Sequence, residues 1–487
     1  MNGPIRRVAV AVFLGFVVLL GSATWFQVIG VNRYRDDSRN PRTLLSESGK
    51  ERGVIVTLDG TILARSTVDP DSSRSFVRHY PEGEAFSPVV GYFTGAAGSQ
   101  GLEAAFAVDL RSRRDFTISD LIAAALGEDL RPRSLQVTID PELTRLAYEL
   151  LDGRKGAVVA LAPSTGEVLA YVSSPSYNPT SLVSTDLPAA IAERQRLLDD
   201  PNQPLLDRAG GTFYPPGSTF KTVVAAAAID LGFAGIDTTF SDPQVFPLPG
   251  SSAGIANSNG EVCNDGVSVT LEDAFVKSCN TVFASLAIQL GAEQLGTVAE
   301  RFTFGKQTEF PWEIPPAVFK TQELSQDPAA LGQSGIGGRD VRATPLTMAM
   351  VAAAIANEGK VMDPILVRQI FDADGNTVKL FEPRVSIRAV SPATAATLSL
   401  LMERVVIEGT GTRATVPNIR VAGKTGTAEA SNGFPTVWFI GFAPVENPTI
   451  ALAVVLEDGG GAGESAGGGS VAAPIAGRLI HYWMSRQ

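Results

Sequence analysis

An uncharged apolar run near the start of the sequence places the tightest limit on what the chain can fold into. The run extends from Val8 to Gly30, directly after Arg6 and Arg7. As a helix it would measure about 34 Å, enough to cross the hydrocarbon core of a membrane with some tilt. We therefore expect a cytoplasmic tail over residues 1–7 and a transmembrane signal-anchor over residues 8–30.

A cleaved signal peptide is the alternative interpretation of this run. Gly21 to Ala23 would then supply the small residues of the cleavage site. We favour the uncleaved anchor, because the apolar run continues past these residues. Under either interpretation the rest of the chain lies outside the cytoplasm, so we expect a single-pass protein of the plasma membrane.

Composition and charge exclude several classes of function. The chain has 487 residues, with 40 basic and 51 acidic side chains and a formal net charge of −11. We expect no nucleic-acid partner, because no lysine-rich run or basic stripe stands out. With only two histidines, His79 and His481, and two cysteines in the chain, we expect no metal. The scarcity of histidine also disfavours a Ser-His-Asp triad.

The two cysteines, Cys263 and Cys279, lie in the part of the chain expected outside the cytoplasm. That location permits a disulfide between them. The alternative is a pair of free thiols buried as small apolar groups. We favour the disulfide.

Residues 31–132 mix short segments with many charges and glycines. Two β-branched, apolar runs surround Asp59 and Gly60 in VIVTLDGTILA and predict a β-hairpin. We recognise no catalytic group in this region. It is therefore expected to form a small, mixed, non-catalytic pedestal domain.

A second unit, over residues 133–487, begins with a capped helix. Asp140 is a good N-cap, Pro141 suits the first helical position, and apolar residues recur at helical spacing through Leu151. The run GAVVALAPSTGEVLAYVSSPSYNP then predicts a hairpin around its Pro-Ser-Thr-Gly turn.

The remainder of this unit is first helical and then extended in pattern. Residues 218–358 are alanine-rich, with the clearest helices in AFVKSCNTVFASLAIQLGAEQLGTVAERF and TPLTMAMVAAAIANEG. Strand patterns follow in IRVAGKTGTAEA, TVWFIGFAPVE and TIALAVVLEDG, and a closing helix in VAAPIAGRLIHYWMSR. This order predicts an α/β (α+β) fold in which helices flank one central antiparallel sheet.

The segment YPPGSTFK places Ser218 at the start of an apolar helix and Lys221 one turn later. A serine hydroxyl is a weak nucleophile that needs a base within reach, and a lysine amine can be that base only when neutral. Burial, a nearby cation and the positive end of a helix dipole all lower the pKa of a lysine. The alternative is a capping serine beside an unrelated lysine, since this spacing occurs about once by chance in a chain of this length.

The segment KSCNT offers a second set of polar groups, 60 residues further on. Ser278 can relay a proton to a leaving group, and the amide of Asn280 can bond the backbone of a peptide substrate. The alternative is a capping serine with a polar neighbour.

The segment GKTGTAE lies within a strand pattern and includes Lys424, Thr425, Gly426 and Thr427. A glycine inside a strand often marks the close approach of another backbone or of a ligand. The lysine and the two hydroxyls suit the carboxylate end of a peptide that pairs alongside the strand.

In this order, YPPGSTFK, KSCNT and GKTGTAE resemble the three motifs of the penicillin-binding proteins and serine β-lactamases. The combination of one membrane anchor and a pedestal domain resembles the organisation of the class B penicillin-binding proteins. The length of the chain and the sequence AFVKSCN most resemble the actinobacterial A group of that class. The resemblance covers nearly the whole chain after residue 40. It implies a transpeptidase domain over residues 133–487, with an all-helical subdomain and without a glycosyltransferase unit before it.

The resemblance implies D,D-transpeptidation in peptidoglycan synthesis and division. Ser218 would attack the penultimate D-alanine of a stem peptide, and Lys221 would take the proton of Ser218. Backbone N–H groups of Ser218 and Thr427 would form the oxyanion hole. Ser278, between Lys221 and Lys424, would pass a proton to the departing D-alanine.

The remaining site residues are expected to bind the peptide. Asn280 would hold the backbone of the peptide, and the peptide would lie along the strand from Lys424 to Thr427. The resemblance implies no metal or organic cofactor. The implied partners are peptidoglycan stem peptides, β-lactam antibiotics, a membrane glycosyltransferase and other divisome proteins.

Three other functions use or tolerate the same motifs. A D,D-carboxypeptidase or a β-lactamase would use water as acceptor, and product analysis with an amine acceptor would separate them from a transpeptidase. A β-lactam sensor is disfavoured, because no cytoplasmic signalling domain is seen. A non-catalytic divisome scaffold would still support growth after Ser218→Ala.

Overall fold

The computed structural model describes residues 2–26, 49–70, 72–94, 98–112, 125, 129–183, 186–429 and 433–487. Helix α1 (Asn2–Thr24) is long and apolar enough to cross a membrane, and no other helix in the described ranges is. It begins ahead of the apolar run, because arginine is a good helix former and charge does not end a helix. Residues 27–30 of the predicted span lie outside the described residues.

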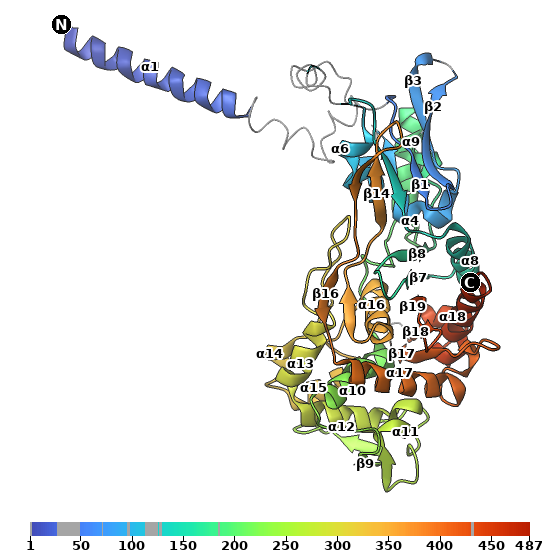
Figure 1. Ribbon diagram of the computed structural model, residues 1–487. Coiled ribbons are helices and arrows are strands. Elements are labelled where there is room, and N and C mark those ends of the chain that lie inside the picture. The colour runs from blue at the N-terminus through green and yellow to red at the C-terminus, as the bar shows by residue number, and fades with distance from the viewer. Residues whose placement is uncertain are drawn as a thin grey trace.

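A six-stranded sheet forms the upper part of the molecule as drawn in Figure 1. The predicted hairpin around Asp59 and Gly60 is confirmed, since β1 and β2 pair antiparallel. Strands from both sides of residue 132 join this sheet, and the boundary there stays a prediction. In sheet order the strands are β15 (Thr377–Leu380), β14 (Val367–Phe371), β6 (Ser134–Val137), β1 (Ile55–Thr57), β2 (Ile62–Asp69) and β3 (Ser72–His79).

A buried ion cluster fixes this upper part. Glu103, on α5 (Gly101–Ala105), is fully buried and contacts Arg52 at 2.9 Å and Arg78 at 2.7 Å. Burial alone would raise the pKa of Glu103, but the attraction of Arg78 and Arg52 outweighs it and holds the pKa below its usual value. The cluster therefore joins three segments through one carboxylate.

The central sheet of the larger body is antiparallel throughout, as the sequence predicts. All of its strands are buried, and alternate residues enter different apolar clusters: Ala157 on one face and Val158 on the other. In order the strands are β17 (Ala422–Ala428), β18 (Thr436–Ala443), β19 (Ile450–Leu456), β7 (Gly156–Leu161) and β8 (Val168–Ser174).

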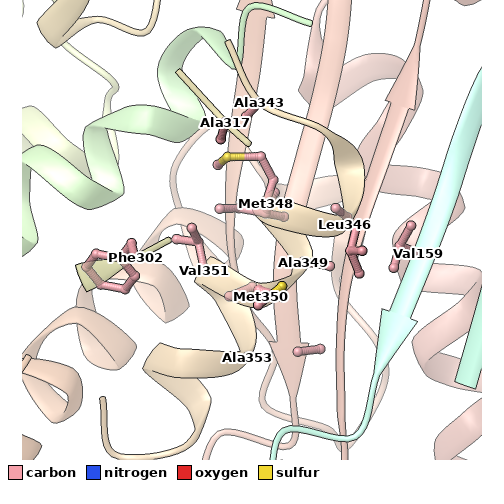
Figure 2. Packing of buried hydrophobic residues seen from close by; sticks show 14 of the residues in the cluster. Val159, Phe302, Ala317, Ala343, Leu346, Met348, Ala349, Met350, Val351 and Ala353 are labelled. Carbon is pink, nitrogen blue, oxygen red and sulfur yellow. The ribbon is translucent and has the colours of Figure 1, made fainter. Parts of the chain in front are cut away.

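Helices cover both faces of this sheet. On one face lie α8 (Pro141–Leu151) and the closing helix α18 (Gly468–Met484). The predicted cap of α8 is confirmed, since Asp140 Oδ1 accepts from the N–H of Leu143 at 2.8 Å. On the other face lies α16 (Pro345–Ala356), where Figure 2 shows Leu346 directed toward Val159 of β7.

The helical region below the sheet is more broken than its sequence suggests (Figure 1). The long apolar pattern becomes three helices, because Ser278 and Gly291 adopt positive φ angles of 65° and 79°. The helices are α10 (Lys221–Asp230), α11 (Leu271–Val276), α12 (Asn280–Leu290), α13 (Ala292–Arg301), α14 (Thr321–Leu324), α15 (Pro328–Gly335) and α17 (Pro392–Ile407).

Short strand pairs also interrupt the region that was predicted to be mostly helical. They are β9 (Thr239–Ser241) with β12 (Ser268–Thr270), and β10 (Val245–Pro247) with β11 (Gly254–Ala256). The remaining elements are η2 (Gly83–Phe86), α4 (Ser87–Val90), β4 (Phe93–Thr94), β5 (Gly98–Ser99), α6 (Ala107–Leu110), η3 (Pro179–Leu182), α9 (Leu187–Asp199), η4 (Gly217–Phe220), β13 (Lys360–Met362), β16 (Val385–Arg388), η5 (Thr412–Ala414) and η6 (Asp458–Gly461).

Removing the charge of Glu103 is expected to destabilise the upper part strongly. Glu103→Gln leaves two buried guanidinium groups without their counter-charge, which costs about 3–5 kcal/mol. Chemical denaturation of the full chain in detergent measures this. Because the pKa of Glu103 is lowered on folding, its stabilisation is present above about pH 4.3 and is lost as the pH falls through the folded-state value.

Glu193→Gln is the matched control. Glu193 pairs with Arg196 one helical turn away, and the arginine is 61% exposed. Loss of this exposed ion pair is expected to lower the free energy of unfolding by less than about 1 kcal/mol. Equal effects of the two substitutions would contradict a structural role for the buried cluster.

Candidate active site

The turn that carries Ser218 is held against the central sheet. The 3₁₀ turn η4 precedes α10, so the predicted helix starts as a tighter turn than expected. The indole of Trp438, on β18, donates to the carbonyl of Pro215 at 3.0 Å. Ser218 is half-buried, whereas Lys221, at the first position of α10, is fully buried. The nucleophile candidate thus stays accessible while the base candidate loses contact with solvent.

Two glycines allow this turn to touch β17. A Cβ atom on Gly426 would lie 2.8 Å from the carbonyl oxygen of Pro216 and 2.9 Å from a methyl carbon of Thr219. A Cβ on Gly217, whose φ is +53°, would lie 2.6 Å from the carbonyl oxygen of Thr427. The sequence suggests that Gly426 makes room for a peptide. In the structure it makes room for the turn that bears Ser218.

The amine of Lys221 reaches the second motif. Its Nζ donates to the carbonyl oxygen of Ser278 at 2.6 Å and to Asn280 Oδ1 at 2.7 Å, and it lies 3.3 Å from Ser278 Oγ. A carbonyl oxygen and an amide oxygen can only accept hydrogen bonds. The two short contacts therefore use two N–H groups of the amine.

The pKa of Lys221 lies well below its ordinary value, first because the side chain is buried and second because Lys424 repels its charge. Burial also lowers the pKa of Lys424, to about 7. A neutral amine has two N–H groups and one lone pair. With both N–H groups bonded to the second motif, the lone pair of Lys221 is left to receive a proton from a hydroxyl.

Ser278 lies between the two lysines, the position that the family resemblance implies. Its Oγ accepts from Lys424 Nζ at 2.9 Å and lies 3.3 Å from Lys221 Nζ. Its φ of 65° interrupts the helical backbone between α11 and α12, and its carbonyl oxygen is directed at Lys221. One residue thus contacts both amines.

The amide of Asn280 is used on both sides by the protein. Its Nδ2 donates to the carbonyl oxygen of Ala256 at 3.0 Å, and its Oδ1 accepts from Lys221. The structure therefore gives Asn280 a role in orienting the base. Its contact with a peptide substrate stays a prediction.

The residues of the third motif face two ways. Lys424 is fully buried and joins Ser278, whereas the hydroxyl of Thr425 contacts the hydroxyl of Thr410 and is buried. Thr427 is exposed, and its Oγ1 accepts from the N–H of Gly468 at 3.2 Å. Successive residues of a strand point to opposite faces. The structure thus unites Lys424 with the lysine–serine cluster but turns Thr425 away from it.

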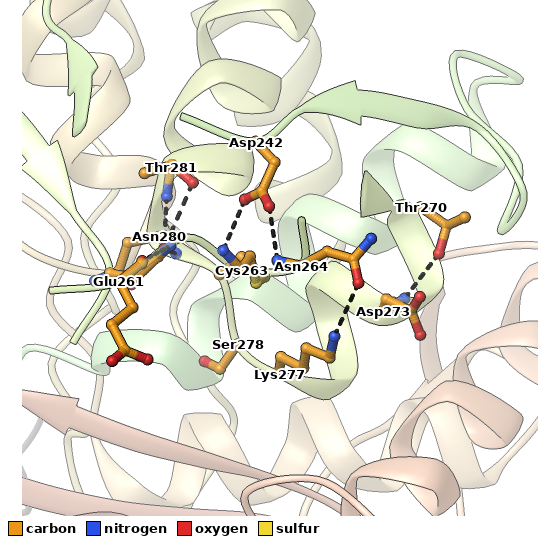
Figure 3. Close-up of a disulfide and its surroundings, with 12 residues drawn as sticks. Asp242, Glu261, Cys263, Asn264, Thr270, Asp273, Lys277, Ser278, Asn280 and Thr281 are labelled. Carbon is orange, nitrogen blue, oxygen red and sulfur yellow. Dashed lines mark hydrogen bonds between the residues drawn. A yellow bond between two sulfur atoms is a disulfide. The ribbon is translucent and has the colours of Figure 1, made fainter. Parts of the chain in front are cut away.

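Cys263 and Cys279 are joined by a disulfide with their Cα atoms 5.9 Å apart (Figure 3). The bond attaches the segment between Ser278 and Asn280 to a loop that follows β11. Within the described ranges, no three His, Cys, Asp or Glu side chains are grouped so as to hold a metal ion.

Sequence analysis missed Asn257. Its Oδ1 accepts from the N–H groups of Asn280 at 2.7 Å and Thr281 at 3.3 Å, so it caps α12 from a distant loop. Local capping is visible in a sequence as a polar residue next to a helix start. A cap supplied from 23 residues upstream leaves no such signal.

Comparisons with known proteins agree with this geometry. The profile of the Penicillin binding protein transpeptidase domain matches residues 156–481, and that of the Penicillin binding protein A dimerisation domain matches residues 52–132.

Two curated relatives extend over nearly the whole chain. The peptidoglycan D,D-transpeptidase PbpA of Mycolicibacterium smegmatis is 42% identical, over 98% of this chain and 97% of its own. The protein of the same name from Mycobacterium tuberculosis is 39% identical, over 99% and 98%. Penicillin-binding protein A of M. tuberculosis, solved as a ceftriaxone acyl-enzyme complex, superposes with a TM-score of 0.83 at 37% identity, covering 90% of this chain and 99% of the solved chain.

Adding a methyl group at Gly426 is expected to impair acylation of Ser218. In Gly426→Ala the new Cβ meets the carbonyl of Pro216, so the turn must move away from β17. A misplacement of a reacting group by about 1 Å costs about 100-fold in rate. The measurement is the second-order rate constant for acylation by a fluorescent penicillin.

Gly235→Ala is the control for that substitution. A Cβ at Gly235 would meet no atom within 4 Å, and its backbone lies outside the positive-φ region. It should react like the natural protein. A Gly426→Ala protein that folds and reacts at the natural rate would show that the contact between turn and strand does not position the nucleophile.

Proposed function

The chain belongs to the penicillin-binding protein transpeptidase family, and from this premise we propose how its residues carry out peptidoglycan D,D-transpeptidation. The enzyme is a serine acyltransferase of cell wall synthesis that β-lactams acylate. The observation that supports our assignment of roles is the placement of Ser278 between two buried amines, 2.9 Å from Lys424 and 3.3 Å from Lys221.

Acylation begins at Ser218. Its Oγ attacks the carbonyl carbon of the penultimate D-alanine, and its proton passes to the lone pair of neutral Lys221. The lowered pKa of Lys221 supports this role, because a base must be unprotonated at the working pH. The negative charge that develops on the carbonyl oxygen is bonded by the backbone N–H groups of Ser218 and Thr427. The close approach of Gly217 to Thr427 supports this pairing of N–H groups.

Collapse of the tetrahedral intermediate breaks the peptide bond and releases the terminal D-alanine. Its nitrogen needs a proton, which Ser278 Oγ supplies while Ser278 regains one from an adjacent lysine. The amine of a second stem peptide then attacks the carbonyl carbon of the acyl-enzyme and gives up one proton to the same groups. They pass a proton to Ser218 Oγ as its ester bond breaks. The new amide is the cross-link, and the cycle leaves no net change on the protein.

The donor peptide is expected to pair alongside β17, as an added strand between Lys424 and Thr427. Asn280 would contact its backbone through the N–H that is not directed at Ala256. A β-lactam would occupy the same place and remain as an ester on Ser218, because its leaving group stays attached.

The location that we propose is the plasma membrane, and α1 supports it because this helix is long and apolar enough for a single span. We place the catalytic domain, over residues 133–487, and the pedestal, over residues 31–132, on the extracytoplasmic side of the plasma membrane. A membrane glycosyltransferase that makes the glycan strands, and other divisome proteins, are the partners that this placement favours.

Replacing the base by a residue that stays protonated is expected to slow acylation severely. Arginine stays protonated at any working pH, so Lys221→Arg cannot accept the proton of Ser218, and the rate should fall at least 100-fold, up to about 10,000-fold. In the natural protein the rate should rise as the pH increases through the lowered pKa of Lys221. The pH dependence of penicillin acylation measures both effects.

Lys277→Arg is the control, because this lysine is exposed and directly precedes Ser278. Its rate of acylation should equal that of the natural protein. Intact mass and peptide mapping should place the adduct on Ser218, and Ser218→Ala should abolish it. An adduct on another side chain would contradict the assignment. Cross-linked product from a donor peptide and an amine acceptor, against hydrolysis alone, separates a transpeptidase from a carboxypeptidase.

A further inference from the structure

We propose that Asp242 is a positioning residue for acyl transfer. It fixes, through the Cys263–Cys279 disulfide, the segment that carries Ser278 and Asn280. The inference rests on the role proposed for Lys221 as base.

Asp242 is fully buried directly after β9. Figure 3 shows its carboxylate directed at the loop that contains Cys263. It accepts three backbone N–H groups, from Cys263 at 2.8 Å, Asn264 at 2.6 Å and Gly266 at 3.1 Å. Hydrogen bonds to an ionised group are about twice as strong as those between neutral groups. One buried carboxylate therefore sets the course of this loop.

The disulfide transmits that position to the second motif. Cys263 belongs to the loop that Asp242 holds, and its partner Cys279 lies between Ser278 and Asn280. The N–H of Cys279 is itself bonded to the carbonyl of Ala274 at 2.8 Å. A shift of the loop thus acts on Ser278 and Asn280 through covalent bonds.

The same loop and Ala256, the last residue of β11, make further contacts with α12. Asn257 Oδ1 accepts the N–H groups of Asn280 and Thr281, and the carbonyl of Ala256 accepts from Asn280 Nδ2. Asn257 in turn donates to the carbonyl of Glu261 at 3.0 Å. The loop therefore holds the start of α12 by a disulfide and by hydrogen bonds.

Such restraint is needed because Ser278 has an uncommon backbone. A non-glycine residue at positive φ is strained and persists only where its surroundings impose it. Here the carbonyl of Ser278 and the amide oxygen of Asn280 accept the two short hydrogen bonds of Lys221. If the segment relaxed, Lys221 would lose the partners that leave its lone pair for Ser218.

Asp242 acts by position rather than by its charge. The charged group that shifts the pKa of Lys221 is Lys424 on β17, in addition to burial. The other groups that contact the Lys221 amine are neutral: Ser278, Asn280 and, at 5.6 Å, the ring of Phe283. Loss of the anchor would admit water to this cluster and return the pKa of Lys221 toward its ordinary value.

The test is Asp242→Asn in the full chain, with the pH dependence of acylation by a fluorescent penicillin as the readout. An amide in place of the carboxylate presents an N–H to backbone donors, so the loop shifts. We expect acylation about 10- to 100-fold slower near neutral pH. We also expect the rising limb of the pH profile to move to higher pH.

Asp265→Asn is the matched control, since Asp265 is an exposed aspartate of the same loop that accepts the N–H groups of Val267 and Ser268 at 2.8 and 2.9 Å. Its pH profile should match that of the natural protein. A merely structural effect of Asp242 would lower the fraction of protein that reacts without moving the limb. That outcome, or an unchanged rate, overturns the proposal.

Cys263→Ala tests the same proposal if the Asp242→Asn protein does not fold. It removes the disulfide to Cys279 without changing the carboxylate of Asp242. The rising limb of its pH profile should also move to higher pH. A folded Cys263→Ala protein with the natural profile overturns the proposal. Failure of the function itself is distinguishable, because then the natural protein would carry no penicillin adduct on Ser218.

Discussion

The burial of two lysine amines beside one serine is the interaction on which the rest of the site depends. Moving an ammonium group out of water is costly, and a second one nearby adds repulsion. The protein meets the cost by letting Lys221 be neutral and by surrounding both amines with oxygen acceptors and aromatic rings. A neutral amine, the form that can act as a base, is thus favoured in a residue type that is ordinarily protonated.

The fold is organised to keep these amines buried together. Lys221 begins α10, Lys424 lies on β17, and Ser278 lies in the break between α11 and α12. Only close contact between these elements excludes water, and glycine at positions 217 and 426 removes the side chains that would hold the turn and the strand apart. Backbone packing therefore controls the chemistry as directly as the reactive groups do.

The central sheet and the capped helix α8 could be predicted from the sequence. These features depend on local patterns: apolar runs, turn residues, and Asp140 next to Pro141. The sequence was not sufficient for the break in the long helical pattern, because Ser278 takes its positive φ from distant contacts. Asn257 and Asp242 escaped notice for the same reason, since a cap or an anchor supplied across the fold has no local signature.

Acyl transfer needs a base in one half of the cycle and an acid in the other, and the geometry of Ser278 meets both needs. Two amines that repel each other favour a state in which only one carries the extra proton. Because the hydroxyl of Ser278 contacts both, a proton taken from Ser218 by Lys221 can move to the leaving nitrogen without a large motion of any side chain. The strained backbone of Ser278 is then the cost of holding one hydroxyl within reach of two amines. An ordinary helical residue at that position would continue α11 and carry the hydroxyl away from them.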